Sequence, residues 1–236
     1  MSEHKDNLPD GHSNYLKISQ VSEINTTFDE AALNEGKKLL RQADSSLNRA
    51  RKLDKDNGNS DVAAFYFERS IYERASALEF LPQLGWKDHL DLMEAQTALA
   101  VWDNLLPAKF DADMSPEEIA EMTLITRNAL IENAEESFEN AVQAAGGVDA
   151  ATPNILAKIF SMRAKMLAKV ASSGNQNVKT KKADLIEALS GIEDAQRLIN
   201  QIGARKIGRI MLSRDIKKQG QRLRSLAEER SAKKIA

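Results

Sequence analysis

Residues 115–147 read SPEEIAEMTLITRNALIENAEESFENAVQAAGG, and this stretch decides the fold class of the chain. Ser115 suits a helix N-cap, Pro116 suits the first helical turn, and Glu118 is spaced to complete a capping box. The pair Gly146–Gly147 is typical of a helix stop. At 1.5 Å per residue, about thirty helical residues would form a rod of roughly 45 Å.

One side of this expected rod is apolar, and the rest of it is acidic. The apolar side has positions spaced mostly three or four residues apart, as one helix face requires: Ile119, Met122, Thr126, Leu130, Ala134, Phe138, Ala141 and Ala145. We interpret the acidic residues Glu132, Glu135, Glu136 and Glu139 as a solvated or partner-facing surface.

The remaining helices are predicted from apolar periodicity between glycine, proline and asparagine breakers. They are expected at about 27–57, 60–81, 86–106, 152–171, 185–202 and 205–236. The third of these seven helices in chain order has Leu99 and Trp102 beside its main stripe, which predicts burial on more than one side. Sustained period-two alternation is absent, so no strand is predicted.

The sequence therefore predicts an all-α fold of about seven helices, arranged as an antiparallel bundle or as stacked helical hairpins. Residues 1–25 are expected to form a flexible N-terminal arm, because they are polar and contain Pro9 and Gly11. The helical-hairpin bundle would span 26–203, and a basic amphipathic helix would span 204–236.

Two segments resemble the second helix of a tetratricopeptide repeat. One is Ala43-x3-Leu47-x2-Ala50-x2-Leu53-Asp54, and the other is Ala134-x3-Phe138-x2-Ala141. The resemblance implies closely packed helix pairs. The first-helix pattern of that family, Trp-x2-Leu-Gly-x2-Tyr, is missing before both segments, which also lie 91 residues apart. Alanines at this spacing are equally expected in any tight helical bundle.

Composition excludes several classes of protein. The chain has no cysteine, which excludes disulfides, thiolate metal sites and cysteine nucleophiles. The first residues, MSEHKDNLPDGHSNY, lack the apolar segment of a signal peptide. No apolar run approaches the roughly 20 residues of a membrane span, so a soluble, cytoplasmic protein is expected.

A nucleotide site is not supported by the glycines at 203 and 208. The segment GARKIGR, residues 203–209, has the glycine spacing of a phosphate-binding loop. That loop requires Lys-Ser/Thr after the second glycine and a strand before the first. Here Arg209-Ile210 follows and a helix precedes, so we reject this interpretation.

Histidine usage gives little support to catalysis or to metal binding. The only histidines are His4, His12 and His89, whereas a di-iron carboxylate bundle needs Glu-x2-His on two helices. Trp86 stands three residues before His89, and we interpret His89 as an exposed helix histidine near Asp88. We expect no catalytic, cofactor or metal site. An enzyme would require an apolar pocket with converging polar groups, and His89 beside Asp88 would be the first place to look for it.

The charge of the chain is divided between its two parts. Residues 1–150 carry 14 Lys and Arg against 28 Asp and Glu, while residues 151–236 carry 19 against 7. From Ala204 onward there are 11 basic and 3 acidic residues. The candidate residues for binding an anionic partner are Arg205, Lys206, Arg209, Lys217, Lys218, Arg222 and Arg224.

Several partners could meet this basic segment. Nucleic acid, an anionic membrane and a groove-type protein partner all attract such charge, although no aromatic residue is present to stack on bases. The basic segment could also pair with the acidic helix of the same chain or of another copy. The leading hypothesis is a non-enzymatic adaptor or assembly subunit, possibly a homo-oligomer, and the alternative is a nucleic-acid-binding accessory protein. A basic face left open by the fold would favour nucleic acid.

Overall fold

The computed structural model describes residues 30–57, 60–107, 111–172 and 182–201, together with 213–214, 216–221 and 224–225. Within these ranges every regular element is a helix, and the all-α prediction is confirmed. The helices are α1 (Glu30–Asn57), α2 (Asp61–Ala77), α3 (Trp86–Ala100), α4 (Pro116–Ala144), α5 (Gly147–Ala150), α6 (Pro153–Ser172) and α7 (Lys182–Gln201). The predicted arm at 1–25 and the first residues of the helix predicted at 27–57 lie outside the described residues.

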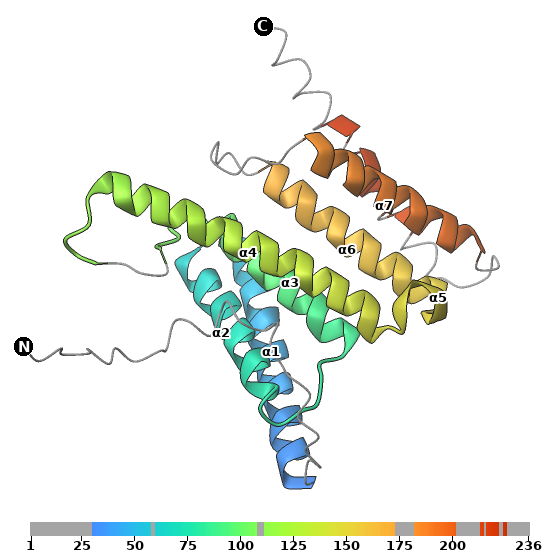
Figure 1. Ribbon diagram of the computed structural model, residues 1–236, viewed down its shortest axis with the longest axis horizontal. Helices are drawn as coiled ribbons and strands as arrows, with labels where there is room; N and C mark the ends of the chain where they lie inside the picture. Colours follow the sequence, from blue (N-terminus) through green and yellow to red (C-terminus); the bar gives the residue numbers. More distant parts are fainter. Residues whose placement is uncertain are drawn as a thin grey trace, which may run out of the picture.

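Three helical hairpins make up the fold: α1 with α2, α3 with α4, and α6 with α7 (Figure 1). Helix α3 is central, because it packs on α2, α4 and α6. Its buried residues therefore point in every direction, from Leu90 and Leu92 to Leu99 and Ala100. This confirms the burial on more than one side that its wide apolar face predicts.

Helix α4 begins and ends as its sequence predicts. The Ser115 hydroxyl accepts a 3.3 Å hydrogen bond from the Glu118 N–H, and the Glu118 carboxylate accepts a 2.8 Å bond from the Ser115 N–H. The helix stops where Gly146 adopts φ +104°, a conformation that favours glycine. The one-turn helix α5 follows at once and was not expected from the sequence.

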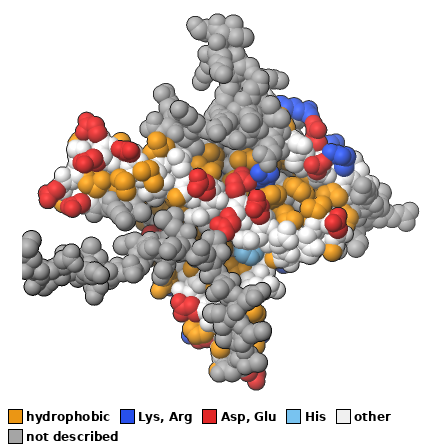
Figure 2. Space-filling model, viewed as in Figure 1, with side chains coloured by type: hydrophobic (Ala, Val, Ile, Leu, Met, Phe, Trp, Pro, Cys, Tyr) orange, Lys and Arg blue, Asp and Glu red, His pale blue; other side chains and the backbone are white. Residues whose placement is uncertain are grey.

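Figure 2 shows the charges spread unevenly over this framework. Carboxylates lie along α4 and at its free end, whereas Lys and Arg gather at the α7 end of the molecule (Figure 2). The first eleven residues of α4, 116–126, contain no buried side chain. This part of α4 extends beyond the helices that support its second half (Figure 1).

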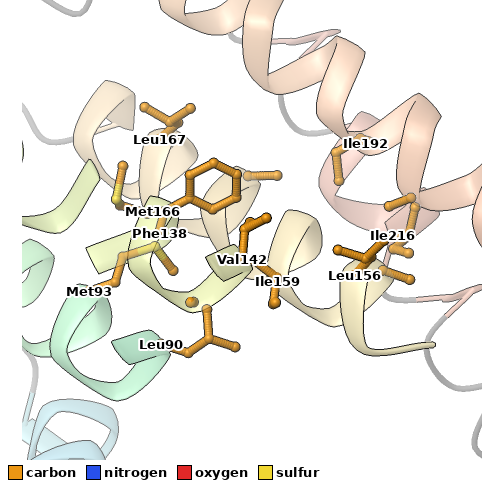
Figure 3. Packing of buried hydrophobic residues seen from close by; sticks show 14 of the residues in the cluster. Leu90, Met93, Phe138, Val142, Leu156, Ile159, Met166, Leu167, Ile192 and Ile216 are labelled. Atoms are coloured by element: carbon orange, nitrogen blue, oxygen red, sulfur yellow. The ribbon is translucent and has the colours of Figure 1, made fainter. Parts of the chain in front are cut away.

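The core consists of two clusters that meet along α3. One lies between α1, α2 and α3 and contains Leu47, Phe67 and Leu92. The other joins α3, α4, α6 and α7 and continues to Ile216, beyond the end of α7. Figure 3 shows Ile216 beside Leu156, near Ile192, at the α6–α7 end of this cluster. The described part of the predicted C-terminal helix is thus attached to the core.

Candidate interaction surfaces

The outward face of α4 is acidic. The helix contains seven glutamates and one basic residue, Arg127. Of the four predicted contact residues, Glu132 and Glu139 are exposed, and Glu135 and Glu136 are half-buried. Glu135 accepts a 2.9 Å hydrogen bond from Arg163 Nε of α6, so it is partly neutralised.

The acidic face is longer than the sequence analysis proposed. Glu118, Glu121 and Ile125 lie on the side of α4 that also carries Glu132 and Glu139, since their spacings of three, four and seven residues bring them onto one helix face. All five side chains are exposed. From Glu118 to Glu139 this surface, which we call the α4 ridge, extends about 31 Å. It consists of carboxylates with an apolar contact point at Ile125.

Arg127 is absent from the α4 ridge because it points into the fold. Its guanidinium donates hydrogen bonds of 2.5 Å to the Ala100 carbonyl and 2.6 Å to the Trp102 carbonyl, at the C-terminal end of α3. A cation at this helix end offsets the negative end of the helix dipole. Burial lowers the pKa of Arg127 from its ordinary value. The one base of α4 is thus used internally.

The predicted anion-binding residues are only partly described. Lys217, Lys218 and Arg224 are exposed, and Arg224 lies 3.7 Å from Glu193 of α7. Arg214, which the sequence analysis did not single out, is exposed on the same side. We call Arg214, Lys217, Lys218 and Arg224 the C-terminal basic face. The remaining predicted residues, Arg205, Lys206, Arg209 and Arg222, lie outside the described part of the chain.

The opposite side of this segment is packed on α7. Ile216 is 1% exposed, and a Cβ added to Gly220 would lie only 3.2 Å from Ile192 Cγ2. Gln196 Nε2 lies 3.5 Å from Ser213 Oγ. Gln219 is half-buried, and Leu212, Leu223 and Leu226 are outside the described residues. Lys217 and Lys218 are thus exposed on a segment whose Ile216 packs on the core, while Arg224 lies 3.7 Å from Glu193 of α7.

His89 lies at the contact between α3 and α4 and is half-buried, rather than exposed as the sequence suggested. The small pocket beside it is lined by Gln96, Asn133, Glu136, Ser137 and Asn140 and has room for about one water molecule. Burial lowers the pKa of His89. Asp88 accepts a hydrogen bond from the Gly85 N–H instead of from His89. A pocket of this size holds no organic substrate.

An ionic network centred on one buried arginine joins α1, α2 and α3. Arg74 is fully buried, and its Nη2 lies 2.6 Å from Asp44 and 2.9 Å from Asp91. Arg51 binds Asp91 and Glu94, both at 2.8 Å. The sequence did not predict this network. The position of Arg74 could have indicated it, because Arg74 falls between Ile71 and Leu78 on the apolar stripe of α2, where a charge needs buried partners.

Helix α2 also exposes an apolar face. Apolar periodicity alone would place Phe65 and Tyr72 with Phe67 and Ile71, yet they are 55% and 58% exposed, and Val62 is 54% exposed. Their spacings of three and seven residues bring them onto one side, away from the buried Phe67 and Ile71. Contiguous exposed apolar surface of this kind is typical of contact sites, but here it is small.

Within the described ranges, no group of three or more His, Asp or Glu residues is placed to hold a metal ion. None of the described helices is long and apolar enough to cross a membrane. Comparisons with protein-family models, with curated proteins and with solved structures found no match.

Proposed function

We propose that this chain is a non-enzymatic helical interaction protein, an adaptor or structural subunit of a larger assembly. Its contact surfaces are the α4 ridge and the C-terminal basic face. The observation that carries the proposal is the row of exposed carboxylates on α4, whose one basic residue, Arg127, is buried on the other side of the helix and bound to the end of α3.

The geometry of the α4 ridge supports this proposal. Within the described residues, no ion pair is formed by Glu121, Glu132 or Glu139. Like charges four residues apart, such as Glu117 and Glu121 or Glu132 and Glu136, destabilise the helix that holds them by a few tenths of a kcal/mol per pair. A cationic partner surface relieves that repulsion and gains long-range steering, which falls with ionic strength.

The test is affinity capture from an extract of the source cells at about 50 and 300 mM salt. The wild-type chain is compared with Glu121→Gln/Glu132→Gln/Glu139→Gln. A matched control removes three exposed acids elsewhere, Glu30→Gln/Asp56→Asn/Glu68→Gln, and has the same net charge. Proteins captured by the wild type and the control, but not by the α4 variant, support the proposal. Identical capture by all three chains overturns it.

A second candidate is a nucleic-acid-binding accessory protein. The observation that favours it is the exposure of Arg214, Lys217 and Lys218 on the segment whose Ile216 is buried against the core. Phosphate contacts of this kind depend steeply on salt. A gel-shift assay at about 50 and 200 mM salt would compare the wild type with Lys217→Gln/Lys218→Gln/Arg224→Gln. Substitution is preferable to truncation, because removing Ile216 would uncover the core at Ile192.

A further inference from the structure

We propose that the C-terminal basic face of one copy binds the α4 ridge of a second copy, so that the chain assembles head to tail. This inference rests on the proposed function and names the partner of the α4 ridge. The two surfaces carry opposite charge. The ridge presents exposed carboxylates. The basic face presents Arg214, Lys217 and Lys218, together with Arg224, whose guanidinium also lies 3.7 Å from Glu193 of its own chain.

The two surfaces also match in length and shape. The C-terminal basic face runs from Arg214 to Arg224, about 15 Å at the rise of a helix, and the α4 ridge spans about 31 Å. A helix can therefore lie along the ridge with several turns in contact. Ile125, 52% exposed among the carboxylates, provides an apolar contact that the aliphatic stems of lysine side chains can cover.

Pairing within one chain is blocked by the packing of the C-terminal segment. Ile216 and Gly220 hold that segment on α7 at Ile192. Helix α7 packs on α6, and α6 lies between α7 and α4 (Figure 1). The basic face would have to leave its core contacts to reach its own α4 ridge. A second copy can offer its ridge without any such rearrangement.

The symmetry of the assembly follows from the use of two different surfaces. An interface between unlike patches is heterologous, so it produces a ring if the rotation closes and an open chain if it does not. It does not produce the isologous dimer of a two-fold axis. An open chain of copies keeps one unused α4 ridge at one end and one unused basic face at the other, whereas every interior copy uses both surfaces. This property makes the proposal testable with neutral variants.

The experiment is sedimentation velocity on the full chain at about 50 and 500 mM salt over a range of concentrations. The ridge variant is Glu121→Gln/Glu132→Gln/Glu139→Gln, and the basic variant is Lys217→Gln/Lys218→Gln/Arg224→Gln. Glu118 is left intact because it caps α4. Circular dichroism verifies that each variant is folded.

We expect the wild type to form salt-sensitive species larger than a dimer, and each variant alone to associate roughly tenfold or more weakly. Mixing the two variants restores one native interface, between the ridge of the basic variant and the basic face of the ridge variant. The mixture must then form a one-to-one dimer and no larger species. The matched control Glu30→Gln/Asp56→Asn/Glu68→Gln should assemble as the wild type does.

A wild-type monomer at every salt and concentration overturns the inference. So does assembly that both variants retain, or a mixture that stays monomeric. Salt-dependent DNA binding by a monomer, lost in the basic variant, overturns it in favour of the nucleic-acid candidate. Capture of a different protein by the α4 ridge of a monomeric chain overturns self-assembly while the proposed function stands. If the capture experiment also fails, both proposals fall.

Discussion

The Nη1 atom of Arg127 in α4 lies 2.5 Å from the carbonyl oxygen of Ala100, at the end of α3. The same guanidinium reaches the carbonyl oxygens of Trp102 and Asp103 at 2.6 and 3.3 Å. The last carbonyls of a helix have no partner within it, so a side chain from the neighbouring helix satisfies them here. This contact stabilises the α3–α4 hairpin and also leaves the α4 ridge without a cation.

Replacing Arg127 by Met should therefore destabilise the protein by about 2–4 kcal/mol, since buried carbonyls lose a charged donor. Chemical denaturation would measure the loss in the free energy of unfolding. Arg41→Met is the matched control, because Arg41 is exposed on α1, and it should change stability by about 0.5 kcal/mol or less. Equal effects of the two substitutions would contradict the capping role of Arg127.

The buried network around Arg74 predicts strong coupling between charges. Arg74→Met should cost about 3–5 kcal/mol, because it leaves Asp91 partly buried beside Asp88 with less compensation. Adding Asp91→Asn removes one of the unpaired charges. The double variant should thus be more stable than the sum of the two single effects predicts. Urea unfolding of all four proteins measures this coupling, and strict additivity would exclude a direct interaction.

His89 predicts a specific dependence of stability on pH. Its pKa in the folded chain is lowered by burial from the ordinary 6.5. As pH falls through 6.5, the unfolded chain binds a proton that the folded chain does not, so the free energy of unfolding decreases. The loss is complete once the pH is below the folded pKa, and it is absent well above 6.5.

His89→Gln should accordingly lose less stability than the wild type between about pH 7.5 and 5.5. Asp88 acts in the opposite sense, because burial raises its pKa, and Glu136 also lines the pocket beside His89. The difference between the two proteins, measured by urea unfolding at several pH values, isolates the histidine. Parallel pH profiles for the wild type and the variant would show that His89 does not titrate differently on folding.

The sequence predicted the fold class and the helix ends well, because these depend on local chemistry. The cap at Ser115, the stop at Gly146 and the broad burial of α3 are all encoded in residues close together in the chain. The pairing of Arg127 with Ala100 could not be predicted, since it depends on which helices meet. For the same reason, the sequence could not show that the basic segment packs on α7.

For two helices, α2 and α5, apolar periodicity in the sequence did not predict the structure. In α2 the aromatic residues Phe65, Tyr66 and Phe67 are consecutive and point to different sides, so the sequence could not decide which side faces the core. In the structure Phe67 is buried and Phe65 is exposed, because α2 packs on α1 and α3 through the side that carries Phe67. The turn at α5 has too few residues for a periodic signal. In the α4 ridge, Glu132 and Glu139 were predicted as contact residues from the sequence, whereas Glu118 and Glu121 were not.

The two sides of α2 predict unequal effects of substitution. Phe67→Ala should destabilise the protein by about 3–5 kcal/mol, because Phe67 is 4% exposed among core residues. Phe65→Ala should cost about 1 kcal/mol or less, since its main ring contact is the edge-to-face pair with Tyr66 at 5.3 Å. Thermal unfolding of both variants gives the comparison. A large loss from Phe65→Ala would mean that this face is covered.

Substituting Ile216 tests whether the C-terminal segment unfolds cooperatively with the core. Ile216→Ala should reduce the free energy of unfolding by about 2–4 kcal/mol, because the side chain is 1% exposed against Ile192 and Leu156. Lys217→Ala next to it should have little effect on stability, as Lys217 is exposed. Hydrogen exchange would show faster exchange at residues 216–221 in Ile216→Ala alone. Unchanged stability would mean that the segment contributes nothing to folding, and the argument against pairing within one chain would then fail.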